Sequence, residues 1–229
     1  MMKESISPIL GKDDVYAIAT TDGSFTLYNR EFKATYHSLF GAVSESRHTY
    51  LQKCLYTQAE LQKISILEFG FGTGLNAFLA YLFSQKHQKH VDYTGLENIA
   101  IDVAIIHELD YPGYLACPEK KDILTRMHSI SSFHEEYYNF QLHHSRNEIL
   151  QGTSFNCIFF DAFAPEVQPE LWEQIMFDHL FSMTAPGGCL VTYCSKGDVR
   201  RSIERSGYQV SRIPGAPGKR QMLQAFRPS

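Results

Sequence analysis

The sequence predicts an α/β protein in which a mostly parallel, Rossmann-like sheet follows an N-terminal extension. The first observation behind this prediction is a buried strand, a glycine turn and a helix in direct succession over residues 64–83. The second is the alternation of further apolar, strand-like runs with helical segments. The third is a closing pair of strands with no helix between them. At 229 residues, the chain is long enough for one such domain with an appendage.

Residues 1–60 are predicted to form the N-terminal extension. Two β-prone runs, residues 15–20 and 25–29, flank Thr21-Asp22-Gly23-Ser24, which indicates a hairpin. A dense polar stretch from Tyr36 to His48 then leads into an amphipathic helix that carries Leu51, Leu55 and Tyr56. Because this stretch directly precedes the core sheet, it either caps a cofactor or substrate pocket or simply packs there.

The glycine turn is the predicted ligand site. A buried strand over residues 64–69 is followed by Gly70, Gly72 and Gly74, and a helix begins at Leu75. Such a turn presents the helix N-terminus to the crevice where open α/β sheets bind ligands. The pattern is not the dinucleotide fingerprint, and the Glu68 carboxylate beside it favours a positively charged ligand such as S-adenosylmethionine over a phosphate. The alternative is a turn that only lets helix and strand pack.

The next segments place a second acid at the same edge of the sheet. Residues 91–97 are predicted to form a strand that ends in Glu97, where a carboxylate accepts hydrogen bonds from the ribose hydroxyls of an adenosine. The same acid occurs in NAD enzymes, so it indicates adenosine without choosing the cofactor. A helix is expected over 98–109, a helical segment with an irregular middle over 118–136, and a third strand over 139–144.

The strand predicted at residues 155–160 delivers Asp161 to the ligand crevice, which makes Asp161 our first candidate for the reaction centre. The alternative is a turn former or helix cap. The remaining expected elements are a helix from 169 or 171 to 183, a turn at 185–188, a strand at 189–194, a helix at 200–206, and closing strands at 208–213 and 221–226.

Charge distribution gives two opposing indications. The formal net charge of −4 argues against a protein that coats nucleic acid by bulk electrostatics. The segment 196–227 nevertheless carries eight cations against Asp198 and Glu204, and such a local basic surface can hold a few phosphates. These cations are Lys196, Arg200, Arg201, Arg205, Arg212, Lys219, Arg220 and Arg227. For Arg201 and Arg205 taken alone, a solvated helix face is an equally good explanation.

The five cysteines are odd in number and widely spaced, so we expect reduced core residues and neither a disulfide framework nor a zinc site. His143 and His144 are adjacent on a strand and point to opposite faces, so no metal is expected there either. No apolar run approaches the roughly 20 residues that span a bilayer, and the N-terminus lacks a signal-peptide profile. We therefore expect a cytoplasmic protein without a membrane partner. No exposed apolar heptad indicates an oligomer, so we expect a monomer.

Four stretches of the chain together resemble the MnmC-like tRNA methyltransferases. They are Leu67-Glu68-Phe69-Gly70-Phe71-Gly72-Thr73-Gly74-Leu75-Asn76, Phe160-Asp161-Ala162-Phe163-Ala164-Pro165 with Pro169 and Trp172 after it, Pro186-Gly187-Gly188, and Gly218-Lys219-Arg220-Gln221-Met222. The segments Tyr36-His37-Ser38 and 41–48 also match, so the resemblance spans nearly the whole chain. Each stretch alone is weak evidence for this family, but the four stretches together are specific for it.

This resemblance implies a class I S-adenosylmethionine-dependent methyltransferase domain over residues 61–229, with a seven-stranded sheet whose last strand is antiparallel. It implies methylation of the amine of 5-aminomethyl-2-thiouridine at the wobble position of tRNA, giving 5-methylaminomethyl-2-thiouridine. Some members carry a fused FAD-dependent oxidase that prepares this amine. The chain has no room for one, so we expect a stand-alone methyltransferase that relies on a separate enzyme for the aminomethyl group.

The resemblance also implies roles for single residues. The expected cofactor-binding residues are Glu68, Gly70, Gly72, Gly74, Asn76, Glu97, Ser145 and Asp161. Asp161 would in addition orient the amine and accept its proton. Tyr36 and Phe163 would enclose the flipped base, while Lys219 and Arg220 would hold phosphates of the anticodon arm. Ser145 stands where the family usually has an aspartate that meets the adenine amino group, and its hydroxyl is a weaker acceptor.

Three alternatives remain open at this stage. The first is a class I methyltransferase that acts on another amine, in a small molecule or a protein. The second is an aminopropyl transferase of the polyamine-synthase kind, which needs an acidic pocket and is disfavoured by Lys219 and Arg220. The third is a non-catalytic RNA-binding module, which the retained Glu68, Glu97 and Asp161 disfavour.

Overall fold

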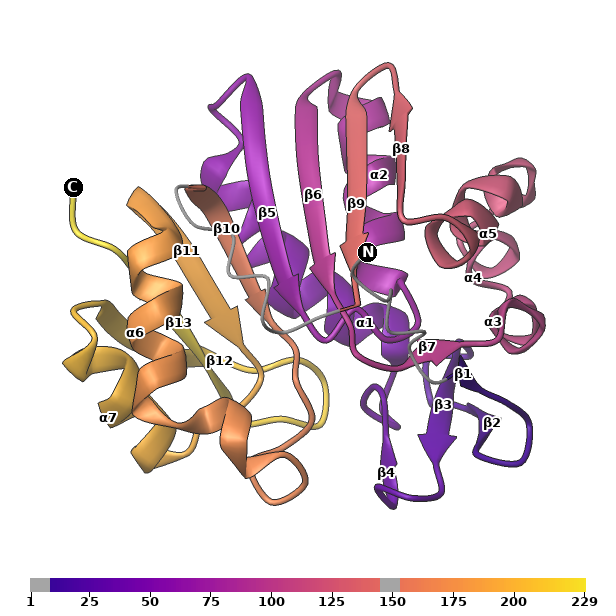
Figure 1. The fold of residues 1–229 in the computed structure, drawn as a ribbon, viewed down its shortest axis with the longest axis horizontal. Coiled ribbons are helices and arrows are strands. Elements are labelled where there is room, and N and C mark those ends of the chain that lie inside the picture. The colour runs from indigo at the N-terminus through magenta and orange to yellow at the C-terminus, as the bar shows by residue number, and fades with distance from the viewer. Residues whose placement is uncertain (1–8, 145–152) are drawn as a thin grey trace, which may run out of the picture.

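A computed structural model describes residues 9–144 and 153–229, and its centre is an eight-stranded sheet in the order β12-β13-β11-β10-β5-β6-β9-β8 (Figure 1). The strands from β9 to β11 are parallel to one another, whereas β8, β12 and β13 run antiparallel to their neighbours. Their bounds are β5 Lys63–Phe69, β6 His90–Leu96, β8 Ser132–Glu135, β9 Tyr138–His143, β10 Phe155–Phe160, β11 Thr184–Thr192, β12 Gln209–Pro214 and β13 Gln221–Phe226. The predicted fold class and the antiparallel closing strands are confirmed.

Helices cover both faces of this sheet. They are α2 Leu75–His87, α3 Val103–Leu109, α4 Tyr111–Tyr114, α5 Lys121–Ser129, α6 Gln174–Met183 and α7 Gly197–Arg205. Successive side chains of a strand point to opposite faces, so the central strands feed two cores. Ile66 and Phe159 belong to the core under α2, α3 and α5, whereas Leu67 and Ile158 belong to the core under α6 and α7. This two-sided burial explains why the central strands are almost entirely apolar.

The N-terminal extension lies below the carboxyl ends of β5, β6 and β9 in Figure 1. The predicted hairpin is confirmed as β2 Val15–Ala19 and β3 Phe25–Asn29, to which a short β4, Ala34–Thr35, is added. Helix α1, Ala42–Ser46, continues into a π-helical turn at Arg47–Gln52 and a 3₁₀ turn at Leu55–Gln58, in place of the single amphipathic helix expected there. Buried residues of this segment, such as Tyr50 and Leu55, share the core under α2.

Two expected helices are shorter than the sequence indicated. The predicted helix over 98–109 begins only at Val103, because β7, Ala100–Ile101, pairs with β1, Ile9–Leu10, and Asp102 caps the helix by accepting a hydrogen bond from the Ala104 N–H. The predicted helical segment 118–136 ends at Ser129. Residues 132–135 form the edge strand β8, where Phe133 stacks on Phe140 of β9, which raises the strand number from seven to eight.

Residues 185–188, predicted as a turn, fall within β11, where the pairing with β10 shifts register between Thr184 and Cys189 and Gly187 has a φ of +74°. Backbone hydrogen bonds join Gly187 N to Arg227 O and Arg227 N to Gly188 O, both at 2.9 Å, and attach this stretch to the end of the chain. Pairing between distant segments of this kind leaves no local sequence signal. The other predicted strands and the helices α2, α6 and α7 lie within a few residues of their expected positions.

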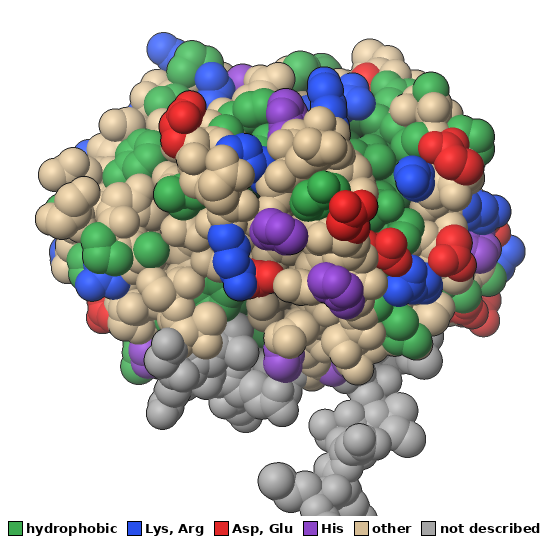
Figure 2. All heavy atoms as spheres, turned by 90° about the horizontal axis from the view of Figure 1, so that it is seen from above, with side chains coloured by type: hydrophobic (Ala, Val, Ile, Leu, Met, Phe, Trp, Pro, Cys, Tyr) green, Lys and Arg blue, Asp and Glu red, His purple; other side chains and the backbone are tan. Residues whose placement is uncertain are grey.

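The cysteines are free, and four of them are buried, as expected for core residues. Within residues 9–144 and 153–229, no helix is long and apolar enough to cross a membrane. Figure 2 views the face at the amino ends of the parallel strands, where cationic, anionic and histidine side chains are intermingled. The site described next lies at the other end of the sheet.

Candidate active site

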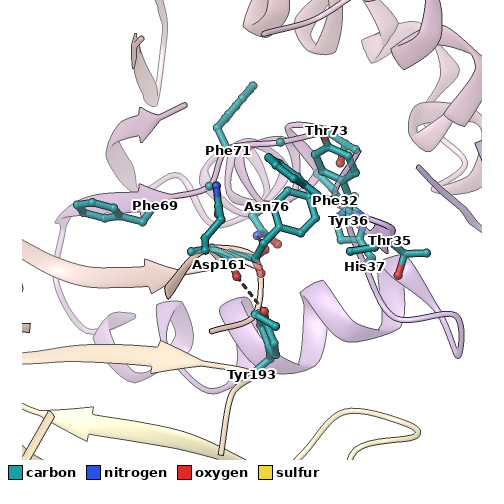
Figure 3. A pocket seen from close by; sticks show the side chains of 18 of the residues that line it. Phe32, Thr35, Tyr36, His37, Phe69, Phe71, Thr73, Asn76, Asp161 and Tyr193 are labelled. Carbon is teal, nitrogen blue, oxygen red and sulfur yellow. Dashed lines mark hydrogen bonds between the residues drawn. The ribbon is translucent and has the colours of Figure 1, made fainter. Parts of the chain in front are cut away.

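A cavity of about 550 Å³ opens at the carboxyl ends of the parallel strands, between the sheet and the N-terminal extension (Figure 3). This size is within the usual range for a cofactor or small-molecule site. The sheet contributes residues at the ends of β5, β6, β10 and β11, and the extension contributes residues 32–39 and Glu45. Residues 36–39 and Glu45 of the polar stretch therefore line the cavity.

The glycine loop forms the floor of this cavity. Gly70, Gly72 and Gly74 have φ angles of +86°, +51° and +73°, a region that other residues adopt at a cost. A Cβ atom on Gly70 would lie 2.5 Å from the backbone oxygen of Asp161, and one on Gly72 would lie 3.0 Å from the Tyr36 ring. Gly70 thus permits the close approach of β5 to β10, and Gly72 leaves room inside the cavity.

Glu97 follows β6 and is fixed at the cavity wall by the backbone. Its Oε2 accepts a hydrogen bond of 3.0 Å from the Gly72 N–H, and its Oε1 accepts one of 3.1 Å from the Ile99 N–H. These two bonds hold the carboxylate against the glycine loop. The structure therefore brings the predicted adenosine-binding acid to the glycine loop.

Asp161 lies at the end of β10, where its side chain meets that of Asn76 from the first turn of α2 (Figure 3). Asn76 Nδ2 donates one hydrogen bond of 2.9 Å to Asp161 Oδ2 and another of 2.7 Å to Glu68 Oε1. The second oxygen of Glu68 accepts a 2.5 Å bond from the Tyr93 hydroxyl. One amide therefore separates two carboxylates and fixes the orientation of Asp161.

Glu68 itself is fully buried and does not line the cavity. Burial raises the pKa of its carboxyl well above the ordinary value. The sequence had suggested a ligand-facing carboxylate beside the loop. In the structure Glu68 lies beneath the loop, and its visible contacts are with Asn76 and Tyr93, so it acts on the cavity only through Asn76.

Burial also raises the pKa of Asp161, to about 8. The nearby negative charge of Glu45 adds to this rise, whereas hydrogen-bond donors around the carboxylate and the Lys219 ammonium oppose it. A carboxylate with a pKa near neutrality is suited to accept a proton from an amine and to release it later. Because a cationic ligand nearby favours the charged form, it would lower this pKa.

Aromatic side chains form the opposite wall. The Phe163 ring contacts Tyr36 and Phe32 edge to face, with ring centroids 5.0 and 5.1 Å apart. Figure 3 shows Phe32 and Tyr36 on the side of the cavity that faces Asp161 and Asn76. The sequence singled out Tyr36 and Phe163 but missed Phe32, whose position after a hairpin carries no signal of its own.

The two predicted phosphate-binding cations are in different places. Lys219 forms an ion pair with Glu45 and lines both the cavity and an adjoining groove, whereas Arg220 is exposed and lines only that groove, together with Lys196. Glu45 and Tyr193, which also line the cavity, were not singled out from the sequence. Tyr193 directly follows β11, so the rule that ligands meet the carboxyl ends of parallel strands could have found it. Ser145 lies outside the described residues.

The cavity fits S-adenosylmethionine better than it fits a phosphorylated cofactor. Its charged lining residues are the acids Glu45, Glu97 and Asp161 and the cations Lys33 and Lys219. Glu97 suits a ribose diol, and the preponderance of acids suits a ligand with positive charge. Gly72 keeps the backbone open to a close-lying ligand. Within the described ranges, no cluster of three or more metal-ligating side chains is present.

Known proteins agree with this assignment. A family profile described as S-adenosyl-L-methionine-dependent methyltransferase matches residues 120–228. The tRNA 5-methylaminomethyl-2-thiouridine biosynthesis bifunctional protein MnmC of Ectopseudomonas mendocina is 28% identical over 218 residues, which are 85% of this chain and 32% of that protein. The protein of the same name from Cupriavidus necator is 28% identical over 230 residues, 88% of this chain and 33% of that protein.

Among solved structures, the crystal structure of MnmC2 from Aquifex aeolicus matches with a TM-score of 0.80 at 24% identity, covering 96% of this chain and 75% of that chain. By these comparisons the chain is similar to the MnmC-like methyltransferases. Its fold is the Rossmann-like fold of class I methyltransferases. The matching family profile indicates S-adenosylmethionine as the cofactor. This methyltransferase spans about a third of the length of the curated relatives it matches.

Proposed function

We propose that this methyltransferase methylates the amine of 5-aminomethyl-2-thiouridine at the wobble position of tRNA. The names of its relatives supply the substrate, since they are proteins of 5-methylaminomethyl-2-thiouridine biosynthesis. The observation that carries the proposal is the Asp161 carboxylate, which is fixed by Asn76 at the cavity and has a pKa raised to about 8. A base of this kind is needed for an amine and is of less use for a substrate without a proton to lose.

S-adenosylmethionine supplies a methyl group on a positively charged sulfur, which makes the methyl carbon an electrophile. The protein's task is then to align the amine with that carbon and to keep the amine unprotonated. In this mechanism Asp161 accepts the proton that the amine loses, directly or through water. Glu97 and the glycine loop hold the cofactor, and they are placed on the floor and wall of the same cavity.

The substrate base enters the aromatic side of the cavity. We place it against Tyr36 and Phe163, since unstacking a nucleotide of an anticodon loop costs little and aromatic rings compensate for the lost stacking. The backbone of the anticodon arm would follow the groove that carries Lys196 and Arg220, where cations contact phosphates without reading sequence. The aminomethyl group would come from a separate enzyme. We also propose that residues 61–229 form the catalytic domain and that the protein is a cytoplasmic monomer.

A substrate competition tests the proposal. Purified protein is given S-adenosylmethionine with an isotopically labelled methyl group and four acceptors: tRNA with 5-aminomethyl-2-thiouridine, the same tRNA without the aminomethyl group, a simple alkylamine, and a lysine-rich protein. We expect the label in the first acceptor alone. Label in the alkylamine or the protein, with none in tRNA, would instead establish a methyltransferase for another amine.

A further inference from the structure

The Lys219 side chain occupies a position that binding of tRNA phosphates does not explain. It belongs to the loop between β12 and β13 and lines both the cavity that contains Asp161 and the adjoining groove, whereas its neighbour Arg220 lines the groove alone. Only 31% of the Lys219 side chain is accessible. A cation that serves as a phosphate contact is normally on the outer surface, where the backbone passes.

Two side chains hold the Lys219 ammonium in place. Its Nζ lies 2.5 Å from Oε1 of Glu45, a carboxylate from the N-terminal extension that is 5% exposed and whose other oxygen accepts a 2.7 Å bond from the Ser38 N–H. The same Nζ lies 3.9 Å from the centroid of the Tyr193 ring, a cation–π distance. The Tyr193 hydroxyl donates a 2.8 Å bond to the carbonyl oxygen of Ala162, next to Asp161.

The loop itself is shaped to bring Lys219 there. A Cβ atom on Gly215 would lie 2.5 Å from the backbone oxygen of Lys219, and Gly218 has a φ of +82° with the Phe40 ring packed against it. The Lys219 N–H closes the turn with a 2.8 Å bond to the Ala216 carbonyl. Two glycines and a closed turn therefore fix the point from which the lysine side chain extends.

An ammonium group carries three N–H donors. Glu45 accepts one of them, and the Tyr193 ring lies against another part of the group. Because Lys219 lines the cavity, the remaining donor is available to a bound ligand that offers an acceptor. The Glu45 charge balances that of Lys219, which weakens it as an anchor for phosphate and suits it to a neutral carbonyl group.

From this geometry we infer that Lys219 reads the substrate base, by donating a hydrogen bond to the carbonyl oxygen at ring position 4 of a pyrimidine. The inference rests on the proposed function. In a 5-aminomethyl pyrimidine, the ring position next to the aminomethyl group carries an oxygen acceptor in uridine and an amino donor in cytidine. With the amine at Asp161, that edge of the ring faces the wall where Lys219 and Tyr193 lie. Lys219 thereby selects uridine and rejects cytidine, because in cytidine the amino group at position 4 and the Lys219 ammonium would both be donors.

The test compares anticodon stem-loops that carry 5-aminomethyluridine or 5-aminomethylcytidine at the wobble position. For the unaltered protein we expect a kcat/KM at least about 100-fold higher with the uridine. In Lys219→Met, which keeps the length of the side chain and removes its donors, we expect the value for the uridine to fall about 10- to 100-fold and that for the cytidine to change little. The preference then largely disappears.

Two further variants make the result decisive. Arg220→Met is the matched control: it should lower kcat/KM for both stem-loops equally and reduce the salt dependence of RNA binding. The double variant Glu45→Gln, Lys219→Met removes the unpaired buried carboxylate that Lys219→Met alone would leave, so a loss of preference there reports recognition and not misfolding.

An equal loss for both bases in the Lys219 variants, together with a weaker salt dependence, would make Lys219 a phosphate contact and overturn the inference. A protein that methylates neither stem-loop nor the thiolated tRNA would overturn the proposed function itself. These two failures are therefore separate observations.

Discussion

At the scale of single residues, the chemistry of the site depends on the amide of Asn76. Its two N–H groups donate to Glu68 and Asp161, so two acids lie in one buried network without direct contact. Reversing the amide would place its oxygen against both carboxylates, which fixes the orientation electrostatically. Glu68 does not reach the cavity, but it helps to orient the Asp161 carboxylate through Asn76.

The first prediction concerns the pKa of Asp161. In a titration of protein with ¹³C-labelled aspartate, the Asp161 carboxyl resonance should move with a midpoint near pH 8, because burial disfavours the charged form. Saturation with S-adenosylmethionine should lower this midpoint, since the sulfonium favours the carboxylate. A midpoint near the ordinary value for aspartate, with or without cofactor, would contradict the assignment of Asp161 as a base that works near neutrality.

The second prediction concerns Glu97. Replacing Glu97 by Ala should weaken the binding of S-adenosylmethionine about 10- to 100-fold in calorimetry, because charge-assisted hydrogen bonds to the ribose are lost. Glu119→Ala, which removes an exposed acid outside the cavity, serves as the control and should leave the Kd unchanged. Equal affinities of the two variants for S-adenosylmethionine would mean that the ribose does not bind at Glu97.

At the scale of elements, the strand, glycine turn and helix of residues 63–87 were predictable because their signals are local. Apolar β-branched residues, three glycines and a helical repeat are all read within one window. The start of α3 and the strand β8 were not predictable in this way. Ala100–Ile101 becomes a strand through pairing with Ile9–Leu10, and residues 132–135 become one through packing on β9, so distant partners decide both.

A third prediction concerns the glycine turn. Gly70→Ala should lower the free energy of unfolding by roughly 1–3 kcal/mol, because the new Cβ would meet the backbone oxygen of Asp161 at 2.5 Å and the residue has a positive φ. Urea unfolding measures this difference. In the control Gly11→Ala, where the nearest atom is 3.9 Å from the added Cβ, the midpoint should hardly move. Equal midpoints for the two variants would mean that the turn tolerates a side chain.

At the scale of the whole molecule, the cavity exists because two parts of the chain meet. Glu45 and Tyr36 come from the extension, and Asp161 and Tyr193 come from strand ends of the sheet. Sequence reasoning identified the residues that follow predicted strands, such as Glu97 and Asp161, since topology alone brings them together. It did not identify Glu45 or the inward position of Lys219, because these depend on how the extension and the β12–β13 loop pack against each other.

The fourth prediction follows from a histidine that is half-buried under the glycine turn. Burial lowers the pKa of His128 to about 4, and its Nε2 lies 3.0 Å from the Thr73 carbonyl oxygen. With the unfolded-state pKa near 6.5, the unfolded chain binds a proton first as the pH falls, so His128 contributes stability above that value and loses it on acidification. Between about pH 7.5 and about pH 5 the loss should be about 2 kcal/mol.

The measurement is the difference in free energy of unfolding between the protein and its His128→Gln variant at these two pH values. Asp161, whose pKa is raised, contributes with the opposite sign and is present in both proteins, so it cancels in the comparison. We expect the advantage of the unaltered protein to shrink as the pH falls. An advantage that is independent of pH would mean that His128 titrates alike in the folded and unfolded states.

The most direct test of the central claim is nucleoside mass spectrometry on tRNA carrying 5-aminomethyl-2-thiouridine, after incubation with S-adenosylmethionine and either the unaltered protein or Asp161→Asn. With the unaltered protein we expect one added methyl group on the aminomethyl nitrogen. With Asp161→Asn it predicts a rate at least about 100-fold lower, while calorimetry still shows cofactor binding. Cofactor binding without a methylated nucleoside, or an undiminished rate in Asp161→Asn, would contradict it.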